Sequence, residues 1–153
     1  MIRRQGFCTA AAVVAMCLAV PAKSSSADST EAMATVYEAA QFTGVCLNRA
    51  LYFVRGSRVF AVDAASGMPN KVILRYIVGD RVYDADRYTG RQTNVVLRYI
   101  VGDRVYAANA LNGARTDKVL AYIEGSKVYA ADNASGARTN VALRCIAGTA
   151  KTD

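Results

Sequence analysis

The sequence contains no histidine and no tryptophan. The absence of histidine excludes Ser-His-Asp and Cys-His nucleophile arrangements, histidine-ligated zinc and ordinary histidine acid–base chemistry. Its one extended apolar run, residues 7–20, is too short to span a bilayer comfortably. Charged residues make up only 20% of the 153 residues and apolar residues 53%, which indicates one folded domain rather than a disordered polar chain.

The N-terminus has the pattern of a secretory signal peptide. Arg3 and Arg4 precede the apolar run, and small residues suited to cleavage end at Ala22 and again at Ala27. We therefore expect a signal peptide over residues 1–27, a flexible leader over 28–34, and a secreted or periplasmic, cell-envelope location. An uncleaved membrane anchor and a lipidated cysteine are the alternatives. Removal after Ala27 lowers the formal charge from +7 to +4.

Glycine recurs every 23 residues in two columns, and the ten residues LRYIVGDRVY occur twice, at 74–83 and 97–106. Such repetition determines the architecture, because each repeat is one supersecondary unit. We expect residues 35–148 to form one repeat domain, with a partial unit at each end and a tail over 149–153. The two columns are Gly56, Gly79, Gly102, Gly125 and Gly148, and Gly44, Gly67, Gly90, Gly113 and Gly136.

Each unit reads as a β-hairpin followed by a second, longer turn. Gly102-Asp103 separates two runs of β-branched and aromatic residues, which is typical of a tight two-residue hairpin. The longer turns begin with an Asp or Asn that can bond its own backbone and end with the second glycine column. The pattern predicts an all-β fold, an antiparallel meander of about ten short strands. An open sheet, a closed barrel and a β-solenoid all remain compatible with it.

The 23-residue period, one hairpin per unit and a Tyr seven residues before a Gly (Tyr83 to Gly90, Tyr106 to Gly113) resemble MORN repeats. That resemblance implies an antiparallel β meander and lipid or protein binding. The Gly-x-Gly positions of the MORN pattern are Asn94 and Val96 here, so we carry no binding site over from it.

The expected hairpin register places aromatic residues opposite each other in every unit, beside a basic residue at the tight turn. These columns are the candidate binding surface, for an anionic polymer or another protein. The alternatives are cross-strand packing for the tyrosines and ordinary solvated arginines for the basic column. A second basic column, Arg75, Arg98 and Arg144, falls on the opposite face with Ile and Val. The candidate binding residues are Arg58, Arg81, Arg104, Lys127, Tyr76, Tyr83, Tyr99, Tyr106, Tyr122 and Tyr129.

Two cysteines, Cys46 and Cys145, follow the signal peptide, and an oxidising compartment permits a disulfide between them. An open meander would hold them far too distant to bridge. The Asp and Asn at the longer turns supply one oxygen ligand group per turn, too few for Ca²⁺, so we expect no metal site and no cofactor.

No unique acid, base or nucleophile interrupts the periodic background, so we do not expect an enzyme. The sequence favours a secreted or periplasmic, non-catalytic repeat protein that presents a Tyr/Arg-rich β surface to an envelope polymer or protein. Nucleic acid is not an expected partner. The alternative is a self-assembling, functional-amyloid-like structural protein that adds copies through exposed sheet edges.

Overall fold

The computed structural model describes residues 32–148, so the expected signal peptide, the expected C-terminal tail and most of the expected leader lie outside the described residues. The first strand begins at Met33, two residues before the expected start of the repeat domain, because Ala34 already packs into the core and is only 1% exposed. The ten strands are β1 (Met33–Ala39), β2 (Cys46–Arg55), β3 (Arg58–Val62), β4 (Pro69–Val78), β5 (Arg81–Ala85), β6 (Gln92–Val101), β7 (Arg104–Ala108), β8 (Arg115–Glu124), β9 (Lys127–Ala131) and β10 (Arg138–Gly148).

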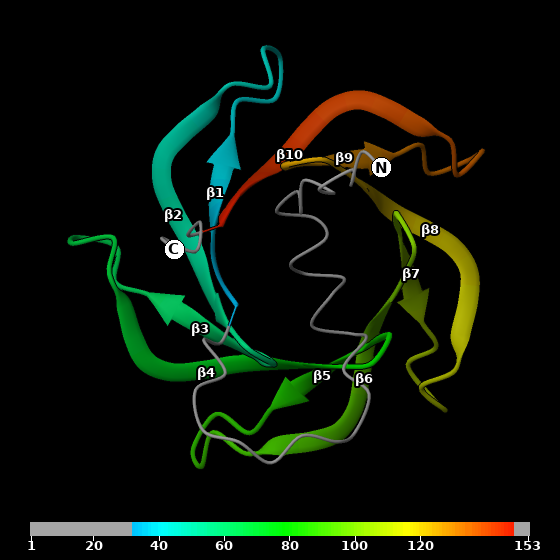
Figure 1. Ribbon diagram of the computed structural model, residues 1–153. Helices are drawn as coiled ribbons and strands as arrows, with labels where there is room; N and C mark the ends of the chain where they lie inside the picture. Colours follow the sequence, from blue (N-terminus) through cyan, green and yellow to red (C-terminus); the bar gives the residue numbers. More distant parts are fainter. Residues whose placement is uncertain (1–31, 149–153) are drawn as a thin grey trace, which may run out of the picture.

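The strands form an antiparallel meander that closes into a barrel, because β1 pairs with β10 as well as with β2. All-β architecture and ten antiparallel strands were predicted, and of the three possible forms the closed barrel is the one found. Short and long strands alternate, so the barrel consists of five short–long hairpins arranged around one axis (Figure 1). The two partial units expected at the chain ends meet and complete the fifth hairpin.

Two kinds of turn connect the strands, as the glycine columns predict. The glycines of both kinds adopt φ between 56° and 69°, a region that residues with a Cβ rarely enter. In the longer turns the Asp side chain accepts hydrogen bonds from the next backbone amides, as Asp63 does from Ser66 and Ala65. These bonds, led by the one from the Ser66 amide, lower the pKa of Asp63 below its usual value. The longer turns extend outward from the barrel and are called the projecting turns below (Figure 1). They span residues 40–44, 63–67, 86–90, 109–113 and 132–136.

The predicted cross-strand register is confirmed in all four tight hairpins, for example Tyr99 opposite Tyr106. Between units, a bulge on the long strand interrupts the pairing, as at Leu97 on β6, where Tyr83 faces Val96 and Val82 faces Arg98. The bulge bends each long strand, so that its first half follows the projecting turn and its second half lies in the barrel wall.

The core lies inside the barrel and consists of one layer of Ile, Val and Ala near the tight turns. Alternation along each strand places these residues on the inward face. No polar or charged residue among those described is buried, so the layer is wholly apolar. Its buried members are Ala34, Val54, Val59, Ile77, Val82, Ile100, Val105, Ala121 and Ile146.

The junction of β1 and β10, called the seam below, has the same register as the tight hairpins. It pairs Cys145 with Tyr37, which are the repeat equivalents of Tyr99 and Tyr106. The four other junctions of this kind are joined by a two-residue turn, and the seam has no such connection. The seam is therefore held by backbone hydrogen bonds, by side-chain contacts and by one covalent link.

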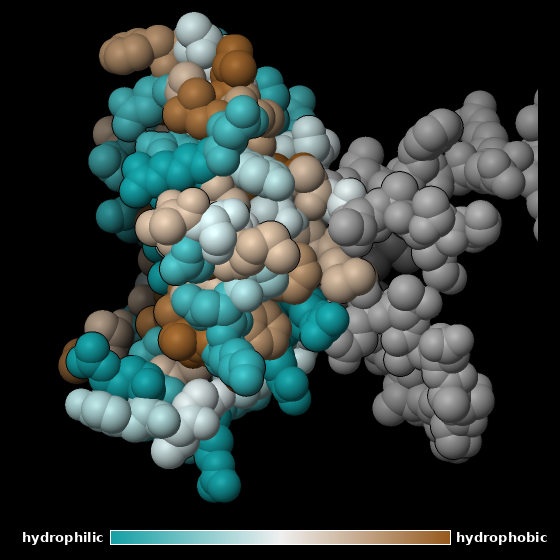
Figure 2. Space-filling view, turned by 90° about the vertical axis from the view of Figure 1, so that its left-hand side faces the viewer, coloured by the Kyte–Doolittle hydropathy of each residue, from teal (hydrophilic) through white to brown (hydrophobic). Residues whose placement is uncertain are grey.

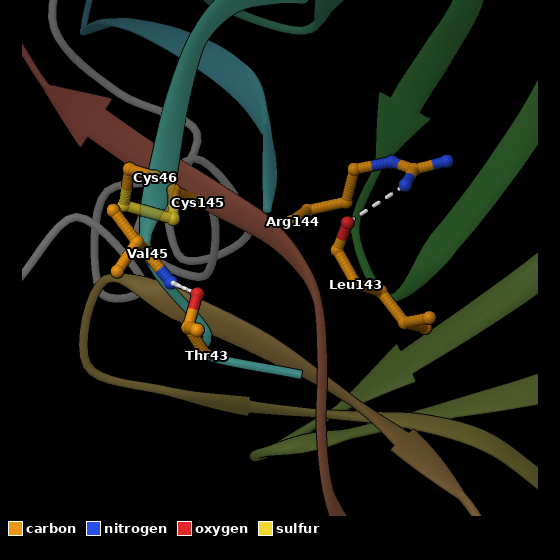
Figure 3. Close-up of a disulfide and its surroundings, with 6 residues drawn as sticks. All are labelled: Thr43, Val45, Cys46, Leu143, Arg144 and Cys145. Atoms are coloured by element: carbon orange, nitrogen blue, oxygen red, sulfur yellow. Dashed lines mark hydrogen bonds between the residues drawn. A yellow bond between two sulfur atoms is a disulfide. The ribbon is translucent and has the colours of Figure 1, made fainter. Parts of the chain in front are cut away.

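That link is a disulfide between Cys46 on β2 and Cys145 on β10, with an S–S distance of 2.06 Å and a Cα–Cα distance of 5.7 Å (Figure 3). It reaches across the end of β1 and ties together the first and last long strands. The sequence separation of 99 residues makes the closed loop nearly as long as the domain itself. In the chain-entropy description, a loop of this length gives a stabilisation of about 4–5 kcal/mol.

We predict that the double variant Cys46→Ser/Cys145→Ser loses about 4 kcal/mol of unfolding free energy, because the seam then depends on noncovalent pairing alone. Urea unfolding of the oxidised protein and of the variant measures the difference. Reduced wild-type protein should resemble the variant, and equal stability of oxidised wild type and variant would contradict the role of the disulfide.

Candidate functional site

The candidate binding residues lie on the outer face of the barrel wall, opposite the apolar core. Figure 2 shows the part of the outer face around β2, β3 and β4, where hydrophilic and hydrophobic residues are interleaved. Arg58, Arg81 and Arg104 are exposed and Lys127 is half-buried. The structure brings the ten residues together in pairs at successive unit junctions rather than into one pocket. We call this set the outer Tyr/Arg surface.

The tyrosines of the long strands are anchored by a hydrogen bond that repeats in three units. The Tyr76, Tyr99 and Tyr122 hydroxyls each donate to the carbonyl of a projecting-turn glycine 14 residues later, at 2.6 Å. Each bond ties the barrel wall of one unit to the projecting turn of the next. Tyr99 is only 7% exposed. The three hydroxyl groups therefore position the turns. The buried Tyr99 ring has little surface left for a ligand, whereas Tyr76 and Tyr122 are half-buried.

Guanidinium groups cover the tyrosine rings. Arg81 lies over Tyr99 and Arg104 over Tyr122, each 5.7 Å from the ring centroid. Such cation–π contacts are worth about 0.5–1 kcal/mol at exposed sites. Asp80 and Asp103 approach Arg81 and Arg104 at 3.8 Å, but both partners of each pair are more than half exposed. Because exposed ion pairs are weak, the arginines remain able to bind another anion.

A groove of about 950 Å³ runs between β5, β6 and the projecting turn of residues 109–113. Arg81, Tyr83, Tyr99 and Arg115 line it. A smaller groove of about 310 Å³ has the equivalent position two units earlier, between residues 48–51 and the turn of residues 63–67. The groove thus recurs at equivalent positions of two units of the repeat, with different sizes.

The repeat alignment places Cys145 in the tyrosine column, but the sequence did not reveal the hydrogen bond whose place the disulfide takes. Cys145 occupies the long-strand tyrosine position of the fifth unit, and Cys46 follows the projecting-turn glycine Gly44 by two residues. The disulfide therefore joins the two places that a Tyr–Gly hydrogen bond joins at other junctions. The signal was present in the repeat alignment, since Cys145 shares a column with Tyr76, Tyr99 and Tyr122.

Arg75, Arg98 and Arg144 lie on the opposite, inward face, at the edge of the apolar layer. Figure 3 shows Arg144 and the disulfide on opposite sides of β10. Within residues 32–148, no three metal-ligating side chains come together, and no helix is long and apolar enough to cross a membrane.

No family model, no curated protein and no solved structure matches this chain. The MORN resemblance therefore stays a prediction from the sequence.

We predict that Tyr99→Phe lowers the unfolding free energy by about 1 kcal/mol, because it removes the hydrogen bond to the Gly113 carbonyl and keeps the ring. Urea unfolding measures the loss. Phe53 stands at the equivalent position without a hydroxyl, so Phe53→Tyr should restore the missing bond and stabilise the protein. Tyr88→Phe, at a residue 88% exposed, is the neutral control; a loss there equal to that of Tyr99→Phe would refute the assignment.

Proposed function

We propose that the protein is a secreted or periplasmic, non-catalytic repeat protein whose outer Tyr/Arg surface binds an anionic polymer of the cell envelope. The observation that carries this proposal is the recurrence of an exposed arginine over a tyrosine ring at consecutive junctions, Arg81 on Tyr99 and Arg104 on Tyr122. The ring holds the guanidinium in one orientation, which lowers the entropy lost when an anion binds.

A polymer suits this surface better than a small molecule. Equivalent arginines are separated by two strands, or about 10 Å at about 4.8 Å per strand. A chain with regularly spaced carboxylate or phosphate groups can contact several of them at once, and the linked contacts add through effective concentration. The groove beside Tyr83 offers half-buried aromatic surface for the uncharged parts of such a chain.

The alternative proposal is self-assembly into a structural, amyloid-like surface material. Three projecting turns favour association of some kind, because Phe42, Tyr88 and Leu111 at their tips are 88–100% exposed. Addition of copies through sheet edges requires a free edge, however, and the barrel pairs both terminal strands with each other. Assembly by that route needs the seam to open first, so we favour the binding module.

The oxidised protein should bind soluble polygalacturonate, an anionic polymer, and should not bind neutral dextran. We predict that Arg81→Gln/Arg104→Gln weakens binding to polygalacturonate about five- to thirtyfold, since two contacts of about 0.5–1 kcal/mol each are lost. Titration calorimetry at low ionic strength measures this change, and added salt should weaken wild-type binding as well.

The matched control is Arg87→Gln/Arg91→Gln, which removes the same charge from two exposed arginines at a projecting turn. It should weaken binding less than twofold. Equal losses in both variants would show that only net charge matters, and an absence of wild-type binding would reject this polymer class. Fibres growing from oxidised, monomeric protein would instead favour the self-assembly proposal.

A further inference from the structure

The inward arginine column forms a cluster that the outer surface does not use. Arg75, Arg98 and Arg144 come from β4, β6 and β10, at equivalent positions of the repeat. The other two units place Tyr52 and Ala121 there, and both belong to or pack against the apolar core layer. We call Arg75, Arg98, Arg144 and Tyr52 the inner arginine ring.

The side chains of this ring lie near one another inside the barrel, although they come from separate strands of its wall. The Arg75 guanidinium lies 5.9 Å from the centroid of the Tyr52 ring, across the intervening strand β3. Loss of solvent, and then the positive charge of Arg75 and of Arg144, lower the pKa of Arg98 from its ordinary value. Because the interaction between charges weakens with distance, this effect places the guanidinium groups of Arg75 and Arg144 near that of Arg98.

The positive charge of the ring is poorly neutralised. Two carboxylates lie opposite it in the register, Glu38 across from Arg144 and Asp84 across from Arg75. Glu38 is paired with Arg49, at 3.3 Å. Within residues 32–148 no carboxylate lies within ion-pair distance of the three ring arginines, and Arg144 donates instead to the Leu143 carbonyl at 2.7 Å (Figure 3).

Solvent reaches the ring from the side of the projecting turns. Arg98 is exposed, and Arg75 and Arg144 are half-buried. On the tight-turn side the next inward residues are buried, among them Ile77 and Ile100. On the other side, the long strands carry Val72 and Val95, which are 51% and 56% exposed. The ring is therefore a charged layer that lies next to the apolar core layer, on the side of the projecting turns.

We propose that the inner arginine ring is a binding site for a phosphate group, either inorganic phosphate or the phosphate of a small phosphorylated molecule. Three guanidinium groups offer planar forks of N–H donors, a geometry that matches the oxygens of a doubly charged oxyanion. Tyr52 holds Arg75 by its ring face. The ligand supplies the negative charge that the described residues do not.

The test is calorimetric titration of the oxidised full-length protein, in phosphate-free buffer at low ionic strength, with inorganic phosphate and separately with glucose 6-phosphate. Tighter binding of glucose 6-phosphate identifies a phosphorylated small molecule as the ligand, and equal or weaker binding identifies free phosphate. Sodium acetate at the same ionic strength should give no binding, because one negative charge cannot engage three guanidinium groups.

We predict that Arg98→Gln weakens phosphate binding at least about tenfold, since a charged donor and its fork are lost. Arg115→Gln, an equal charge change on the outer face beside Tyr106, should weaken it less than twofold. Thermal unfolding supplies a second measurement. Without phosphate, Arg98→Gln should be at least as stable as wild type. Phosphate should raise the melting temperatures of wild type and of Arg115→Gln clearly more than that of Arg98→Gln. Absence of wild-type binding at millimolar phosphate, or equal losses in the two variants, would overturn the proposal. Neither result depends on the outer Tyr/Arg surface.

Discussion

The β1–β10 pairing is the interaction on which the rest of the structure depends. It has the same register as the tight hairpins, yet no turn connects its strands. If it opened, the inner layer would lose its enclosure, and two strand edges would become free to pair with other copies. A disulfide across the seam keeps it closed. It lies in the place where other junctions carry a Tyr–Gly hydrogen bond.

Much of the fold could be predicted from the sequence, because the same strand and turn pattern recurs along the chain in every 23-residue unit. Gly102-Asp103 and its relatives specify the tight turns, and the register that follows places Tyr99 opposite Tyr106, as found. Closure could not be derived, because local pairing rules are the same for an open sheet and a barrel. Curvature depends on the bulges, such as the one at Leu97, and no single residue type marks them.

The sequence indicated which residues form the candidate surface, but it did not indicate what several of these residues do in the fold. The register agrees with the expected placement of the outer columns on one face, and their binding role stays a prediction. Tyr76, Tyr99 and Tyr122 also hold the projecting turns through their hydroxyls, which the sequence did not indicate. The inward column looked like another row of cations along a sheet. Closure converts that row into a ring, because strands that are far apart in an open meander face each other across a barrel. One repeat thus gives rise to two surfaces with different geometry, and we propose that the outer one binds an extended anion and the inner one a compact anion.

Hydrogen exchange at the seam tests the central claim most directly. The amides of Val36 and Ile146 lie opposite each other in the β1–β10 pairing, as Ile100 and Val105 do in the β6–β7 pairing. A closed barrel predicts that the hydrogen-bonded amides of β1 and β10 in the oxidised protein exchange as slowly as those of β6 and β7. Fast exchange along β1 and β10, with protection confined to the central strands, would show that the meander is open and would contradict the account.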